Sequence, residues 1–153
     1  MKRALAAALL AAIAALSAPA GAQKAFIHDE TAGRVQLMQS SKEALGVLSG
    51  MMAGQVRFSS ARARTARRTL IRNTRRIEKA FRKQRLEPLS HAKPAIWDDW
   101  RGFTGLADAA AKAAVRTKPQ DRARLRRPLP ALMQACIACH DRFRTTPPEF
   151  TTH

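Results

Sequence analysis

The sequence predicts an all-α protein, an antiparallel four-helix bundle. In four segments, apolar residues recur at steps of three, four or seven, which is the spacing of one helix face. No stretch alternates apolar and polar residues with the period of two expected of a half-buried strand. Four amphipathic helices with short or moderate connections bury their apolar faces by packing against one another, so the bundle is the expected architecture.

Residues 1–22 have the layout of a secretory signal peptide. Met1–Arg3 is positively charged, Ala4–Leu16 is an unbroken apolar run, and small residues lead up to Ala22 as in a cleavage site. The apolar run is too short for a permanent membrane anchor. We therefore expect export to the periplasm and a single domain formed by residues 23–153.

The first predicted helix runs from about Asp29 to Val56. Glycines interrupt it at steps of four, at Gly46, Gly50 and Gly54. Each glycine costs a helix roughly 1 kcal/mol relative to alanine, so we expect this face to be closely approached. The apolar stripe of this helix consists of Met38, Leu45, Leu48, Met52 and Val56.

The second predicted helix runs from Ala61 to about Arg82, and the hydroxyls of Ser59 and Ser60 are placed to cap its N-terminus. One face carries small and apolar residues and is expected to be buried, whereas the other faces are almost entirely arginine. The expected buried residues are Ala63, Ala66, Leu70, Ile77 and Phe81, and the arginines are Arg62, Arg64, Arg67, Arg68, Arg72, Arg75, Arg76 and Arg82. A less regular stretch follows, from residue 86 to residue 94.

The third predicted helix begins near Asp98 and Asp99, because acidic side chains favour a helix N-terminus. Pro119 bounds it at the other end. Its inward-facing residues are expected to be Trp100, Phe103, Leu106, Ala110 and Ala114.

The last predicted helix begins near Leu129, because Pro128 and Pro130 are tolerated only in a first helical turn. It contains residues 136–144 and ends before the next two prolines. The basic run 122–127 is expected to form a separate turn or a kinked extension.

This last helix contains Cys136-Ile137-Ala138-Cys139-His140, a C-x-x-C-H motif typical of covalent haem c attachment. The two thiols add to the two vinyl groups of the haem. Because positions i, i+3 and i+4 share one helix face, His140 lies under the ring and binds the iron as axial ligand. A zinc site would need further ligands, and a redox C-x-x-C motif is expected in a βα context. We therefore predict one haem c, bound by Cys136 and Cys139, near the C-terminus of the last helix.

With this motif near the C-terminus of a four-helix chain, the sequence resembles the class II cytochrome c family, which comprises cytochrome c′ and its low-spin six-coordinate relatives. Residues 136–144 (CIACHDRFR) are similar to the family's C-x-x-C-H-D-x-F-R ending. Residues 93–103 (KPAIWDDWRGF) are similar to its Pro-x-Ile-Trp segment, and residues 34–38 (RVQLM) to the Arg-x-x-x-Met/Leu of its first helix. The resemblance covers essentially all of residues 23–153.

The resemblance implies roles for three further residues. Arg34 matches a basic residue beside the haem propionates, where a charge-assisted hydrogen bond is chemically sensible. Arg144 matches an arginine on the proximal face near His140. Met38 matches the residue on the distal side of the iron, either as sixth ligand or as a packing residue, and its spacing alone favours packing. The resemblance also leaves open a homodimer formed through the first two helices.

Two haem functions fit this sequence. If the Met38 sulfur binds iron, the haem is six-coordinate and low-spin, and the protein carries one electron at a time in the periplasm. If Met38 only packs over the haem, the iron is five-coordinate and high-spin and binds NO or CO, which fits gas binding or NO detoxification. Neither function makes the chain an enzyme, and its sequence shows no paired carboxylates, activated nucleophile or phosphate loop.

The chain is strongly basic, with 28 lysines and arginines against 11 acidic residues and a net charge of +17. Loss of residues 1–22 removes two basic residues and no acidic one, which leaves +15. A basic helical protein could bind nucleic acid, but export and the few aromatic side chains among the arginines argue against this. The charge instead favours docking to an acidic redox partner protein or to an anionic membrane surface.

Overall fold

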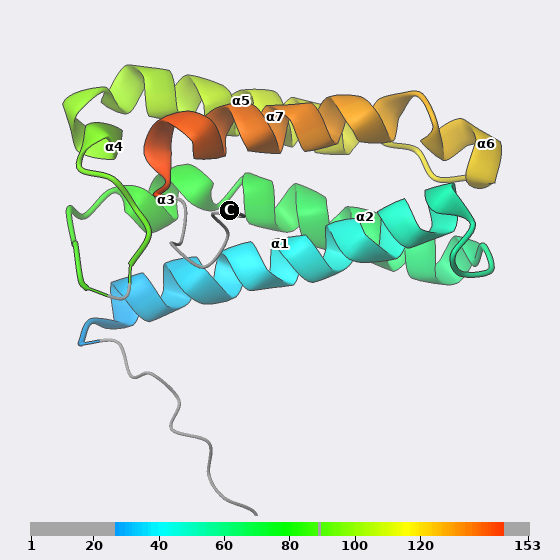
Figure 1. The fold of residues 1–153 in the computed structure, drawn as a ribbon, viewed down its shortest axis with the longest axis horizontal. Coiled ribbons are helices and arrows are strands. Elements are labelled where there is room, and N and C mark those ends of the chain that lie inside the picture. The colour runs from blue at the N-terminus through cyan, green and yellow to red at the C-terminus, as the bar shows by residue number, and fades with distance from the viewer. Residues whose placement is uncertain (1–26, 89, 146–153) are drawn as a thin grey trace, which may run out of the picture.

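The computed structural model describes residues 27–88 and 90–145, and this part of the chain forms seven helices (Figure 1). The four longest of them form an antiparallel bundle, which confirms the predicted fold class. The predicted signal peptide lies outside the described residues. The helices are α1 (Asp29–Ala53), α2 (Ser60–Thr74), α3 (Ile77–Phe81), α4 (Ala95–Asp98), α5 (Trp100–Arg116), α6 (Arg122–Leu125) and α7 (Pro128–Phe143).

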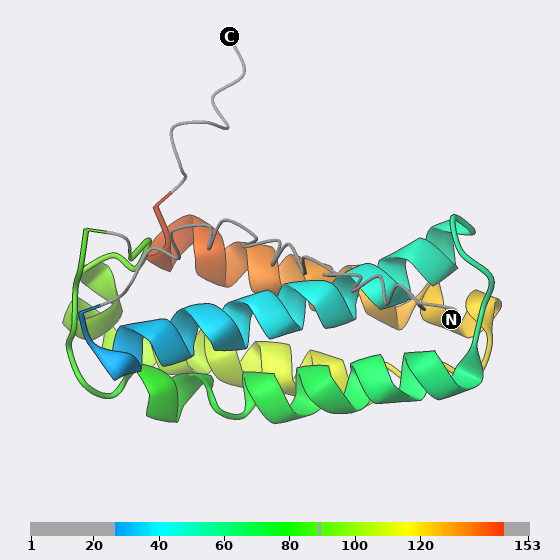
Figure 2. The ribbon, with the colours of Figure 1, turned by 90° about the horizontal axis from the view of Figure 1, so that it is seen from below.

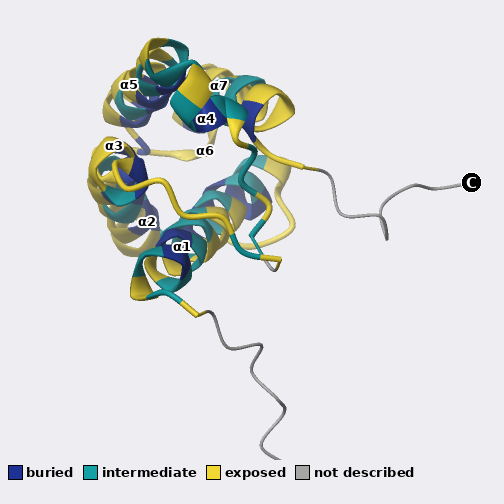
Figure 3. Cartoon of the chain, turned by 90° about the vertical axis from the view of Figure 1, so that its left-hand side faces the viewer, coloured by how far each residue is buried: buried dark blue, intermediate teal, exposed yellow. Residues whose placement is uncertain are grey.

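The four long helices alternate in direction, and α4 and α6 lie at opposite ends of the bundle (Figures 1 and 2). The most closely packed pairs are α1 with α2, α2 with α5 and α5 with α7. The fourth side, between α7 and α1, is the least closely packed side of the bundle (Figure 3). None of the helices in residues 27–88 and 90–145 is long and apolar enough to cross a membrane.

The buried residues form two core clusters, one toward each end of the bundle. In the second, aromatic rings pack edge to face or tilted, with centroids 5.2 Å apart for Phe81 and Phe103 and 5.4 Å apart for Phe103 and Phe143. The first core cluster consists of Ala44, Leu48, Met51, Ala63, Ala66, Leu70, Ala113, Ala114, Leu125, Leu129 and Leu132. The second core cluster consists of Ile77, Phe81, Ile96, Phe103, Ala107 and Phe143.

Helix α1 begins at Asp29 as predicted but ends at Ala53, three residues before the predicted end. Gly54 ends it with a left-handed φ of 81°, a conformation that favours glycine. The Arg122 guanidinium donates hydrogen bonds of 3.1 Å to the carbonyls of Met52 and Ala53 and so satisfies the end of the helix. Val56 was predicted in the buried stripe, and this is wrong, because Val56 lies beyond the helix and is exposed.

The close approach predicted along the α1 glycines is not made by the described residues at Gly46, where a built Cβ meets none of their atoms within 4 Å. At Gly50 the nearest atom, 3.5 Å away, belongs to the segment that directly follows α1. The glycine spacing therefore does not mark a contact with another helix.

The predicted second helix is divided into α2 and α3. The Thr74 hydroxyl donates a 2.8 Å hydrogen bond to the Leu70 carbonyl, a contact that tends to bend helices, and the division follows at Arg75. The predicted buried residues of this segment are all buried. Ser59 caps α2 as predicted and accepts a hydrogen bond from the Arg62 N–H.

The remaining predicted boundaries agree closely with the structure. The Asp99 carboxylate caps α5 by accepting a 3.0 Å hydrogen bond from the Gly102 N–H. Helix α7 begins at Pro128, one residue before the predicted start. The basic run before it forms the separate turn α6.

Candidate functional site

Helix α7 carries the C-x-x-C-H motif in its last two turns. Cys136 and Cys139 are half-buried and form no disulfide, whereas His140 is exposed. Cys136 packs against the first core cluster and Cys139 against the second. The predicted covalent site therefore lies where the two clusters meet.

Half-buried apolar side chains of α1 contact the same two clusters. Leu37 and Met38 pack against the second core cluster, and Leu45 packs against the first. These side chains and the cysteines belong to α1 and α7, which border the least closely packed side of the bundle. The chain thus leaves apolar surface half-covered between two helices. A flat, largely apolar prosthetic group would cover such a surface, so the residues present are suited to hold a haem.

The two thiols lie in a partly desolvated environment. Burial raises the pKa of Cys136, and burial together with the neighbouring Cys136 raises the pKa of Cys139 to about 11. Redox-active C-x-x-C cysteines have lowered pKa values instead. Within residues 27–88 and 90–145, no three histidine, cysteine or acidic side chains are arranged to hold a metal ion by themselves. The raised thiol pKa values thus do not match those of a redox motif.

Arg144 lies next to His140 at the end of α7. Its N–H donates a 2.9 Å hydrogen bond to the His140 carbonyl, and a bridge to Ala92 holds the chain there. Desolvation and the Arg144 charge lower the pKa of the His140 imidazole. The neutral form is the one that binds iron. Arg144 therefore lies where the resemblance expects it, and its role at the proximal face stays a prediction.

Arg34 has partners that the sequence did not indicate. It is only 3% exposed, and its Nε and Nη1 donate hydrogen bonds of 2.9 and 2.8 Å to the carbonyls of Ala80 and Arg85. Its Nη2 donates to the carbonyl of Lys83.

The Arg34 guanidinium also lies 4.8 Å from the centroid of the Phe81 ring and 5.4 Å from that of Trp97. Trp97 in turn donates a 2.8 Å hydrogen bond to the Phe81 carbonyl. Arg34 therefore ties the end of α3 and the following loop to α1, four residues from Met38. Its predicted contact with a propionate stays a prediction.

The fold is shared with solved cytochromes. The cytochrome c′ of Rhodopseudomonas palustris is 24% identical with a TM-score of 0.70, over 78% of this chain and 98% of that one. Cytochrome c556 of the same organism is 21% identical, also with a TM-score of 0.70 and the same coverage. A point mutant of cytochrome c′ from Alcaligenes xylosoxidans, solved as a nitric oxide complex, is 22% identical with a TM-score of 0.66, over 77% of this chain and 95% of that one.

Identities this low show a shared fold and no more. A comparison with curated proteins gave no match. The sequence model of the family described as Cytochrome C′, however, matches residues 29–144, from the first residue of α1 to the residue that ends α7. This match includes the C-x-x-C-H motif, Met38 and Arg34. The chain therefore belongs to the cytochrome c′ family, whose members carry covalently bound haem c.

Proposed function

We propose that this chain is an exported cytochrome that carries one electron at a time in the periplasm. Its single haem c is bound by Cys136 and Cys139, with His140 as axial ligand. One observation carries the proposal. The two half-buried cysteines of α7 pack against the same two core clusters as the half-buried Met38 and its apolar neighbours on α1. Export follows from the signal-peptide layout of residues 1–22.

When bound, the haem supplies an iron that gains or loses a single electron. The chain's own part is to hold it: the two cysteine sulfurs orient the ring, and His140 occupies the proximal side. The apolar side chains of α1 keep water away from the ring and thereby influence the reduction potential. In this proposal the Met38 sulfur completes the coordination on the α1 side.

The alternative is a five-coordinate haem that binds NO or CO. Met38 packs against the second core cluster, and a methionine in an apolar environment serves well as a packing residue. A point mutant of the similarly folded protein from Alcaligenes xylosoxidans was solved as a nitric oxide complex.

Absorption spectra of the matured holoprotein, before and after CO addition, distinguish the two functions. For the electron carrier we expect a sharp α-band on reduction and no change with CO. The Met38→Ala variant should then lose the sharp band and bind CO. A broad high-spin spectrum of the parent that shifts with CO would refute coordination by Met38 and support gas binding.

The covalent bonds are tested separately. We expect the parent to keep its haem in a denaturing gel, whereas the Cys136→Ala, Cys139→Ala double variant should lose it. The Met38→Ala variant is the matched control, since it changes the opposite wall and should keep the haem. Haem retention by the double variant would contradict attachment through the motif.

We also propose that the arginines of α2 dock an acidic redox partner. Arg64, Arg68 and Arg72 are exposed, follow one another at steps of four, and form no ion pair with a carboxylate of the described residues. Like charges at this spacing destabilise a helix by roughly 0.2–0.5 kcal/mol per pair, so a partner that neutralises them gains that energy. Electron exchange with an acidic protein should slow steeply as salt rises. A rate that does not depend on salt would contradict this docking.

A further inference from the structure

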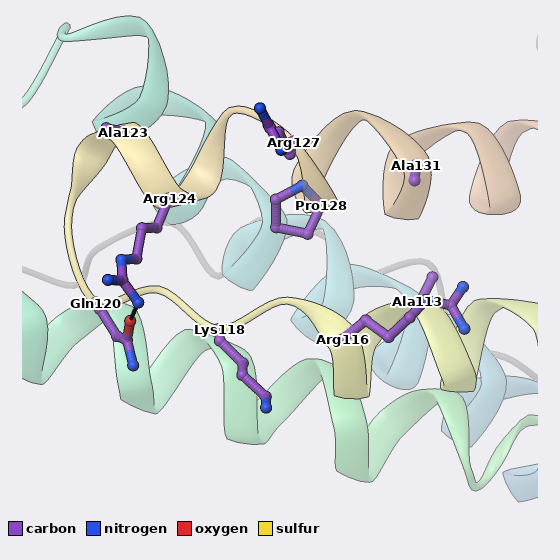
Figure 4. Close-up of a pocket in the computed structure, with 9 residues that line it drawn as sticks. All are labelled: Ala113, Arg116, Lys118, Gln120, Ala123, Arg124, Arg127, Pro128 and Ala131. Atoms are coloured by element: carbon purple, nitrogen blue, oxygen red, sulfur yellow. Dashed lines mark hydrogen bonds between the residues drawn. The ribbon is translucent and has the colours of Figure 1, made fainter.

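A cleft lies at the end of the bundle that is formed by α6, away from the haem motif (Figures 1 and 4). Its volume is about 760 Å³, and it is bounded by the end of α5, the segment 117–121, α6 and the start of α7. His140 is 12 positions along α7 from Pro128, which corresponds to roughly 18 Å of helix. The cleft is therefore separate from the proposed haem site.

Four cationic side chains surround this cleft, and no acidic side chain lines it. Arg116, Lys118 and Arg127 form no ion pair with any carboxylate in residues 27–88 and 90–145. The fourth cation, Arg124, forms an ion pair with Asp121 (Nε to Oδ2, 3.5 Å) and donates a hydrogen bond to the side-chain oxygen of Gln120 (Figure 4). The cations come from three helix ends and one loop, so the fold places at one end of the bundle three positive charges that no carboxylate of the described residues neutralises.

The surface between the cations is apolar. It consists of Ala113 of α5, Ala123 of α6, and Pro128 and Ala131 of α7. The ring of Pro128 lies on the side of α7 that faces α5 (Figure 4). The site thus combines a cationic rim with an apolar floor.

We propose that this cleft binds a phosphate-bearing ligand, with the phosphate at the rim and the organic part on the alanine and proline floor. Phosphate oxygens accept hydrogen bonds from several directions, and guanidinium groups pair with them bidentately. Three cations without a carboxylate partner in residues 27–88 and 90–145 exceed what the single charge of a carboxylate needs. The volume lies within the roughly 300–1,000 Å³ of small-molecule sites and leaves room for more than the phosphate alone. The ligand is either a soluble phosphate ester or the head group of a phospholipid.

The test is isothermal titration calorimetry of the holoprotein with three probes. These are inorganic phosphate, glycerol 3-phosphate, and dihexanoylphosphatidylglycerol below its micelle concentration. The double variant Lys118→Gln, Arg127→Gln removes half of the rim, and the matched control Arg64→Gln, Arg68→Gln removes the same charge from α2. All four side chains are exposed, so both variants should fold.

We expect the parent and the α2 control to bind an organic probe, and the rim variant to bind it at least about tenfold more weakly, since each charge-assisted hydrogen bond contributes about that factor. Ala131→Glu, which places a carboxylate on the floor, should abolish binding. Tighter binding of the lipid than of glycerol 3-phosphate identifies a phospholipid, and the reverse identifies a soluble ester. The proposal is overturned if no probe binds, if the control loses as much affinity as the rim variant, or if inorganic phosphate binds as tightly as both organic probes.

Discussion

Replacement of Arg34 by methionine tests the contacts that join α1 to the loop after α3. The change keeps an unbranched side chain of similar reach but removes every N–H donor and the charge. The carbonyls of Ala80, Lys83 and Arg85 then lose their donors. If these contacts hold the loop, the variant must be less stable than the parent.

The expected loss is about 3–5 kcal/mol. Hydrogen bonds from a charged donor contribute about 1.5–3 kcal/mol each, and the contacts with Phe81 and Trp97 add about 0.5–2 kcal/mol. The simple sum is too high, because Lys83 and Arg85 are exposed and water can reach their backbone once the guanidinium is gone. Arg34→Lys should fall between the parent and Arg34→Met, since an ammonium group cannot span the separated carbonyls as a guanidinium does.

The assay is denaturant unfolding of the holoprotein followed by circular dichroism, with Arg64→Met as the control. Arg64 is exposed on α2, and its replacement should change stability by less than about 0.5 kcal/mol. A loss below about 1 kcal/mol in Arg34→Met would refute the structural role. A shifted reduction potential in the folded variant would show in addition that Arg34 acts on the haem.

Four other substitutions test separate parts of the fold. Leu48→Ala, in a fully buried position, should cost about 2–5 kcal/mol of unfolding free energy, and a smaller cost would contradict the first core cluster. Gly54→Ala should lower the free energy of unfolding, because φ of Gly54 is 81° and a Cβ there would meet the Arg122 guanidinium. Gly46→Ala should raise the free energy of unfolding by about 0.5–1 kcal/mol, because no atom of the described residues lies within 4 Å of a Cβ there. If both variants change stability in the same direction, the left-handed conformation of Gly54 at the end of α1 is refuted. The ion pair with Lys83 lowers the pKa of Glu30 to about 2, below its ordinary 4.5, so this pair stabilises the fold fully above pH 4.5 and loses its effect as pH falls toward 2. Glu30→Gln should therefore flatten the decline of melting temperature over that pH range, and an unchanged slope would exclude the pair as its cause.

The sequence predicted those features that depend on neighbouring residues. The start of α1, the Ser59 cap, the buried face of α2 and α3, and the separate turn α6 all follow from local spacing and from the positions of proline and serine. The C-x-x-C-H motif is also local, because its chemistry depends on three positions within one helix turn. The exact end of α1 was missed by three residues, because a left-handed glycine and a distant arginine end the helix before the apolar pattern does.

Contacts between distant segments left no signal in the sequence. Arg34 looks like an ordinary charge on a helix, yet its donors bind carbonyls 46 to 51 positions away. Asn73 is a buried polar residue on α2 that donates to the hydroxyls of Ser40 and Ser41 on α1. A backbone carbonyl or a lone asparagine has the same identity in any fold, so its partner is known only once the helices are placed.

The sequence by itself determined the helical class, the haem c motif and the excess of positive charge, because composition, periodicity and residue spacing act over one or two helix turns. Only the tertiary structure decided that α1 and α7 border the least closely packed side of the bundle. It also decided that Arg34 is buried against a loop and that the cations around the α6 cleft meet at one end. These features depend on how the four helices pack, and packing brings together residues whose separation along the chain carries no information about their distance in space.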